Sequence, residues 1–180
     1  QRNLLRHVIL ELVLPAPGAV HLEQIVRELV VAREDAQPLV AWSGAEVRRY
    51  RDALYLLPQS SDDLPEVLPV DGSRLSLGAG IGTLCFEHNA ARGLSRDLFE
   101  QGLQLRFRGG GEEIKPLGHR HTRKLKKLLQ DEGVVPWMRD RLPLVFAGDE
   151  LVAVADLWVA AGATSEPGMT VRWDGRPELY

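Results

Sequence analysis

The apolar positions at the start of the chain follow the period of a helix. Between residues 3 and 14 they recur on one helical face, Asn3 precedes them as a candidate N-cap, and Pro15 and Pro17 end the pattern. Residues 21–32 repeat the spacing, with charged side chains on the opposite side. We therefore predict two helices. The stripe predicted to be buried on the first helix is Leu4, Leu5, Val8, Ile9, Leu12 and Val13.

The pattern then changes to short extended runs. Residues 39–42, 46–50 and 53–57 are separated by Ser43-Gly44 and Arg51-Asp52, which predicts three strands joined by tight turns. The segment that follows is polar, acidic and interrupted by prolines, which is typical of a linker. We place this linker at residues 61–72, between a helical domain with a short β-meander at 1–60 and a second domain at 73–180.

The second half is rich in strand patterns. Residues 103–108 alternate apolar and polar positions, and the polar positions include Arg106 and Arg108. Two hairpins are predicted, one turned at residues 78–80 and one at Gly148-Asp149-Glu150, followed by a last strand at 170–173. With one clear helix among them, these elements predict an α+β domain, and the chain as a whole is assigned to the α+β class.

That clear helix, at residues 123–132, is amphipathic. Its leucines fall on one side and its cations on the other, and Gly133 can close it in the left-handed conformation. With Thr122 as the N-cap, Arg123 and Lys124 lie in the first turn, where the helix dipole disfavours positive charge. A bound polyanion would reverse the sign of that effect, because cations and helix amides then act on the same phosphate.

Composition narrows the class of protein. The chain has 180 residues, of which 44% are hydrophobic and 26% charged, and no apolar run is long enough for a membrane helix. Cys85 is the single cysteine, which excludes an internal disulfide, predicts a packed core residue and fits a reducing, cytoplasmic compartment. The chain begins with Gln1, and we expect it to be a piece of a longer protein.

Charge is concentrated in one stretch. Residues 106–127 carry eight basic side chains against Glu112 and Glu113, so this stretch is +6 while the rest of the chain is −9, giving the net −3. Such asymmetry predicts a phosphate-binding surface. The candidate residues are Arg106, Arg108, Lys115, Arg120, Arg123, Lys124, Lys126 and Lys127.

The alternative without a function is that these cations form only a solvent-exposed face that binds no ligand. The triple glycine Gly109-Gly110-Gly111 lacks the lysine of a Walker loop and the spacing of a dinucleotide fingerprint. It therefore predicts either a flexible hairpin or bulge, or a close approach of the backbone to a ligand. His119 and His121 flank Arg120 without a nearby carboxylate or cysteine, so they predict phosphate neighbours or solvent-facing side chains and not a metal site.

Several stretches also resemble a known family. The most specific is residues 124–144, where a lysine-leucine helix, a Val-Pro-Trp-x-Arg step ending at Arg139 and a Leu-Pro-Leu strand occur in the family's order. Together with residues 26–38, 46–55 and 106–108, this stretch resembles the C-terminal half of the bacterial tRNA(Ile)-lysidine synthetases. The resemblance adds Arg139 to the candidate tRNA-binding residues.

This resemblance implies a role in tRNA modification. Members of the family are ligases that use ATP to adenylate C2 of the wobble cytidine in the isoleucine tRNA with a CAU anticodon, then replace AMP with free lysine. The codon read changes from AUG to AUA. The family's N-terminal Ser-Gly-Gly-x-Asp-Ser loop, which implies ATP and Mg²⁺, has no counterpart here. We therefore expect no catalytic residue and no cofactor in this fragment, and inactivity when it is alone.

By analogy with the family, we expect the second domain to bind the acceptor stem of the tRNA. A homodimer is kept as one alternative for the oligomeric state. Two alternatives to a tRNA-recognition fragment are also kept. One is a non-enzymatic module that uses its basic strand and helix surface to bind another RNA or an acidic protein. The other is a small-molecule enzyme working around Gly109 to Gly111.

Overall fold

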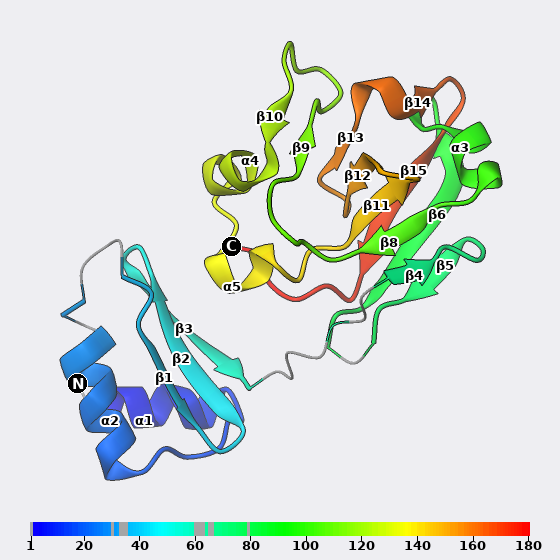
Figure 1. The fold of residues 1–180 in the computed structure, drawn as a ribbon. Coiled ribbons are helices and arrows are strands. Elements are labelled where there is room, and N and C mark those ends of the chain that lie inside the picture. The colour runs from blue at the N-terminus through cyan, green and yellow to red at the C-terminus, as the bar shows by residue number, and fades with distance from the viewer. Residues whose placement is uncertain (1, 30, 33–35, 60–63, 65–66, 79) are drawn as a thin grey trace. The chain divides into compact units, whose positions relative to one another are not determined.

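The computed structural model describes residues 2–29, 31–32, 36–59, 64, 67–78 and 80–180. The chain forms two compact units, Gln1–Asp62 and Asp63–Tyr180. Helices and antiparallel sheets occur in both (Figure 1), so the predicted α+β class is confirmed. Among the described residues no helix is long and apolar enough to cross a membrane.

The first unit combines two helical segments with a three-stranded sheet. Its helical elements are α1 (Arg2–Glu11), α2 (Ala19–Gln24) and a π-helical turn, η1 (Ile25–Leu29). Its strands are β1 (Leu39–Trp42), β2 (Ala45–Tyr50) and β3 (Ala53–Pro58). They pair antiparallel in the order β1-β2-β3, so the predicted helices and meander are confirmed. Asn3 lies inside α1 and is not its N-cap.

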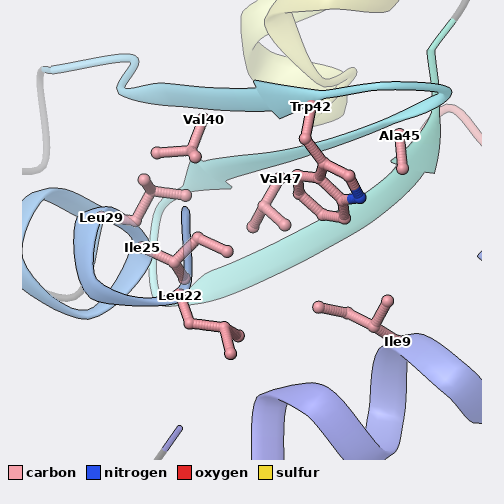
Figure 2. Close-up of a cluster of buried hydrophobic side chains, with 8 residues drawn as sticks. All are labelled: Ile9, Leu22, Ile25, Leu29, Val40, Trp42, Ala45 and Val47. Carbon is pink, nitrogen blue, oxygen red and sulfur yellow. The ribbon is translucent and has the colours of Figure 1, made fainter. Parts of the chain in front are cut away.

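The core of this unit is built from both the helices and the sheet. Figure 2 shows side chains from the helical segments and from β1 and β2 directed into one cluster: Ile9, Leu22, Ile25, Leu29, Val40, Trp42, Ala45 and Val47. The indole N–H of Trp42 donates to the carbonyl of Pro15 at 2.7 Å, which fixes the α1–α2 connection to the sheet. The cluster gives the unit a core of its own.

The buried stripe predicted for α1 is confirmed in part, since Leu5 packs against this cluster beside Ile9 and Val8 is half-buried. Only Ile9 is buried on this helix, whereas Leu4, Leu12 and Val13 are exposed. The helix ends at Glu11, and Val13 takes a left-handed backbone with φ of 56°. Because the chain turns there, the residues after Glu11 cannot continue the helical face.

The second unit contains two five-stranded antiparallel sheets. The first has the order β13-β12-β11-β8-β4 and the second β14-β7-β15-β6-β5. Strands of the first are β4 (Val67–Pro69), β8 (Gln104–Arg106), β11 (Leu144–Ala147), β12 (Glu150–Val154) and β13 (Trp158–Val159). Strands of the second are β5 (Arg74–Ser76), β6 (Thr83–Ala90), β7 (Gly93–Leu94), β14 (Thr164–Ser165) and β15 (Gly168–Asp174).

Short helices and a two-stranded ribbon complete this unit. The ribbon consists of β9 (Glu113–Ile114) and β10 (Arg123–Lys124), and the chain passes from β10 directly into the main helix (Figure 1). The helices are α3 (Arg96–Gln101), α4 (Leu125–Glu132), α5 (Pro136–Arg139) and the 3-10 turn η2 (Ala161–Ala163). Neither α3 nor α5 was predicted.

Both predicted hairpins are confirmed by the β5–β6 and β11–β12 pairings. The strand predicted at residues 103–108 is shorter, because β8 ends at Arg106. Residues 60–63 and 65–66 of the region around the predicted linker lie outside the described residues, so the linker itself stays a prediction. Val67–Pro69, however, form β4 as an outer strand, a position where a proline without an N–H is tolerated.

Cys85 is buried in β6, as expected for a core residue. Burial raises the pKa of its thiol, and so does a hydrogen bond to Asp174, 3.5 Å away. A thiol with a raised pKa is a poor nucleophile at neutral pH. The structure therefore gives Cys85 a packing role.

Candidate nucleic-acid interface

The main helix, α4, is amphipathic in the way its sequence predicts. Leu125, Leu128 and Leu129 are buried, whereas Lys126 and Lys127 are exposed. Gly133 closes the helix at φ 87° and ψ 10°, as predicted, and its N–H donates to the carbonyl of Gln130. The leucines thus hold α4 against the domain and leave its lysines in solvent.

The start of α4 differs from the prediction. Arg123 and Lys124 are not in its first turn, because they form β10 opposite Ile114 and Glu113 of β9. The N-cap position belongs to Lys124 and not to Thr122. The first N–H of the helix, that of Leu125, donates to the carbonyl of Glu112 at 2.8 Å. The first turn holds Lys126 and Lys127 in place of Arg123 and Lys124, so the unfavourable dipole interaction applies to these two lysines.

Two of the eight cations share one acid. Asp131 accepts from Arg123 at 2.6 Å and lies 2.9 Å from the ammonium of Lys127. The hydrogen bonds from Lys127 and Arg123 hold the pKa of Asp131 below its usual 3.8. The carboxylate is therefore ionised at neutral pH and offsets part of the positive charge of α4 and β10.

Arg106 and Arg108 are also engaged within the domain. The guanidinium of Arg106 lies 4.7 Å from the ring centre of Phe146 and donates to Gln104 and to the carbonyl of Gly148. Arg108 lies beyond the end of β8, and only 14% of its side chain is exposed. Its guanidinium is 2.9 Å from Asp140 and 3.4 Å from Glu112. The two arginines therefore do not form the single outward strand face that the alternation predicted.

Four of the predicted cations are exposed and have no ion pair with any other described residue: Lys115, Arg120, Lys124 and Lys126. We call these four the unpaired cations. Lys124 lies in β10, Lys126 in α4, and the other two in the connection between β9 and β10. That connection is bonded to β13 and η2, since Leu117 donates to Val159 of β13 and Ala161 of η2 donates to Lys115, both at 2.8 Å through backbone groups. The unpaired cations are thus carried by ordered backbone.

The remaining candidates have other surroundings. Arg139 is 8% exposed, and its Nε donates to the carbonyl of Val134 at 2.8 Å, so its guanidinium serves the packing around α5. His119 and His121 are exposed. Within the described ranges no three His, Cys, Asp or Glu side chains gather as metal ligands.

The triple glycine forms a defined turn closed by an acid. The backbone N–H groups of Gly109 and Gly110 both donate to the same oxygen of Glu112, each at 2.7 Å. Gly110 and Gly111 have φ of 98° and 90°, a conformation that glycine adopts without strain. The loop therefore presents two converging amides to a carboxylate.

Sequence reasoning missed the acids that pair with these cations. Asp131 could have been found, because it lies four residues after Lys127 on the same helix. Asp140 and Arg108 are separated by 32 residues, and no local pattern connects them. The acids leave fewer cations available to a ligand than the charge count indicated.

Two family models match the chain. A model described as the TilS substrate binding domain matches residues 1–55, and one described as the TilS substrate C-terminal domain matches residues 103–173. The second match includes the ribbon, α4 and all eight predicted cations of residues 106–127.

Similar proteins carry the same family's name. The tRNA(Ile)-lysidine synthase of Methylococcus capsulatus is 37% identical over 179 residues, which cover 96% of this chain and 41% of that protein. The synthase of Coxiella burnetii is 35% identical over 90% of this chain and 36% of its own length. The synthase of Photobacterium profundum is 40% identical over 79% of this chain and 33% of its own length. This chain thus spans about two-fifths of these relatives or less.

Proposed function

Since this chain belongs to the TilS family, the tRNA(Ile)-lysidine synthases, we propose that its two units are the tRNA-binding part of such an enzyme. The structural observation that supports this role most strongly is α4 with β10. Buried leucines dock this segment, while Lys124 and Lys126 are exposed and form no ion pair with another residue that the structure describes. The segment lies within the part of the chain that matches the family's C-terminal domain.

The chemistry of duplex RNA fits such a surface. A helical stem presents mainly phosphates and a shallow groove, so it is held by spaced cations on rigid elements more than by pockets that read bases. If each of the four unpaired cations contacts one phosphate, the logarithm of the binding constant falls with that of the salt concentration with a slope of roughly −3 to −4. Arg123 and Lys127 would add to this slope only after leaving Asp131.

The proposal assigns the ligation chemistry to residues outside this chain. A Ser-Gly-Gly-x-Asp-Ser loop is absent from the 180 residues. The triple glycine lacks the following lysine of a phosphate loop, and the amides of Gly109 and Gly110 donate to Glu112. ATP, Mg²⁺ and free lysine would bind elsewhere in the enzyme. Pyrophosphate exchange measured with this chain, lysine and tRNA should therefore be nil, and any turnover would contradict this assignment.

The finer identity of the partner rests on the family. We propose the isoleucine tRNA with the CAU anticodon, held at its acceptor stem by the second unit in the cytoplasm. Nuclease footprinting of that tRNA should show protection in the acceptor stem. Sedimentation with and without tRNA would show whether one or two copies of the chain bind it.

Fluorescence anisotropy tests the proposal as a whole. The CAU-anticodon tRNA and an unrelated tRNA are titrated with this chain at several salt concentrations. Tighter binding of the first, with the slope given above, is the expected result. Equal binding with equal slopes would contradict specific recognition and favour the alternative of a general RNA-binding module.

A further inference from the structure

The loop between β8 and β9 has the geometry of an anion site that is already filled. The amides of Gly109 and Gly110 converge on one oxygen of Glu112 at 2.7 Å each. Successive backbone N–H groups that point to one place form a nest, a feature that binds phosphate and other anions in many proteins. In this loop the anion is the protein's own carboxylate.

The Glu112 carboxylate leaves some buried polar atoms around it without a hydrogen bond to any described residue. Its second oxygen is buried and has no hydrogen-bond partner within the described part of the chain. The same is true of Nε of Arg108, which lies 3.4 Å away without hydrogen-bond geometry. Only 14% of the Arg108 side chain and 11% of the Glu112 side chain are exposed. A phosphate offers more acceptor oxygens than a carboxylate, so it can satisfy both the amides and the guanidinium. Arg108 keeps Asp140 as a partner in either state.

The backbone of this loop is accessible to a ligand. A Cβ atom built on Gly109, Gly110 or Gly111 would meet nothing within 4 Å, and all three glycines are exposed. The absence of side chains allows a phosphate to approach the amides directly. Among the described residues, therefore, only the side chain of Glu112 occupies the nest.

The nest is joined to the start of the main helix. Glu112 accepts the N–H of Leu125 through its backbone carbonyl, and the next residue, Glu113, lies opposite Lys124 in the backbone register of the β9–β10 ribbon. A phosphate in the nest would thus lie in the loop whose end is bonded to the segment that carries Lys124 and Lys126. This placement connects the nest to the cations of the proposed RNA surface.

We propose that Gly109, Gly110 and Arg108 form a binding site for a backbone phosphate of RNA, which Glu112 occupies in the free protein and leaves when the phosphate enters. The acid moves out because two anions cannot share the same pair of amides. Glu112 thus acts as an internal competitor that makes weak polyanions bind less well. The RNA part of this inference rests on the proposed function, whereas the phosphate site does not.

The test compares Glu112→Ala with Glu113→Ala. The two variants change net charge equally at adjacent positions, and Glu113 is exposed and makes no contact with the nest glycines. Binding of a short RNA duplex is measured by anisotropy. One additional phosphate contact raises the binding constant by about fivefold to tenfold at roughly 0.1 M salt. Glu112→Ala should therefore bind the duplex more tightly than Glu113→Ala by about that factor.

A second readout reports on the nest itself. Inorganic phosphate is titrated while the amide resonances of Gly109 and Gly110 are followed by NMR. Saturable shifts in Glu112→Ala, reached at lower phosphate concentration than in the wild type, are expected. Glu112→Gln keeps an oxygen for the amides but removes the charge, so it should show the same direction of change even if the alanine variant unfolds.

The outcomes separate the two proposals. If neither Glu112 variant shows saturable phosphate shifts, or if both bind RNA no better than Glu113→Ala, Glu112 only closes the loop and the inference is overturned. If the wild type fails to bind any tRNA while phosphate still enters the nest, the proposed function fails and the phosphate site stands.

Discussion

Arg123 donates to Asp131 at 2.6 Å, so a cation of β10 is paired with an acid in the last turn of α4. The same carboxylate lies 2.9 Å from Lys127, which places one anion between two of the cations that the sequence assigns to tRNA. A phosphate that binds Arg123 or Lys127 must therefore compete with an acid of the protein. We therefore expect Asp131 to lower the affinity of the proposed surface for RNA.

Replacing Asp131 by Asn should strengthen RNA binding. The change frees Arg123 and Lys127 and removes one negative charge from the face that we propose to contact the phosphates. We expect about fivefold or more tighter binding at roughly 0.1 M salt and a steeper salt slope, by about one unit for each newly engaged phosphate. Anisotropy at several salt concentrations measures both quantities.

The control for this variant is Glu132→Gln, which removes the same charge one residue further along α4 and is also exposed. An equal gain in both variants would mean that only net charge matters.

The pKa of Asp131 is lowered in the folded protein, so its contribution to stability is present at and above its usual pKa of 3.8. That contribution is lost as the pH falls through the lower folded value.

Lys126→Glu should weaken RNA binding without unfolding the protein. Lys126 is exposed in the first turn of α4, where an acid interacts favourably with the helix dipole. We expect affinity to fall by about tenfold or more at roughly 0.1 M salt, since a contact is lost and a repulsion is added. Thermal unfolding should show an unchanged or slightly higher Tm.

The control is Arg92→Glu, which makes the same charge reversal at an exposed site that precedes β7 in the same unit, although Arg92, unlike Lys126, has an acid, Glu166, at 3.4 Å. It should change RNA affinity much less than Lys126→Glu. A large loss of stability with intact binding in Lys126→Glu would show instead that the lysine face is structural.

Leu129→Ala should act on stability and reach RNA binding only through folding. Leu129 is a fully buried residue of α4. Truncating a buried leucine to alanine lowers the free energy of unfolding by about 2 to 5 kcal/mol. Denaturant unfolding measures the loss, and Leu117→Ala, at a position that is 38% exposed, is the control with a much smaller effect. Weak RNA binding at temperatures where Leu129→Ala is still folded would contradict the docking role of the leucines.

Local patterns in the sequence explain the parts of the fold that were predicted correctly. The spacing of Leu125, Leu128 and Leu129 identified the buried side of α4, and Gly133 identified its end, because both signals lie within the helix itself. The β1-β2-β3 meander was predicted for the same reason, since its turns join strands that are neighbours in sequence.

Interactions between distant residues account for what was missed. Arg123 and Lys124 pair with β9 and form strand, although the pattern of their own segment predicted a helix, so a contact with residues about ten positions away outweighed the local preference. Arg108 and Arg139 are engaged within the domain through contacts with Asp140 and the Val134 carbonyl, which periodicity does not reveal. The fold class and the basic segment could therefore be predicted, but the state of each cation could not.

The most direct test of the central claim uses the fact that all four lysines of the chain, Lys115, Lys124, Lys126 and Lys127, lie within the basic segment. Acetylation of each lysine is followed by mass spectrometry with and without the CAU-anticodon tRNA. If the segment holds tRNA, Lys124 and Lys126 become protected in proportion to the tRNA bound, and an unrelated tRNA protects them less. Unchanged acetylation of all four lysines when tRNA is bound would contradict the account.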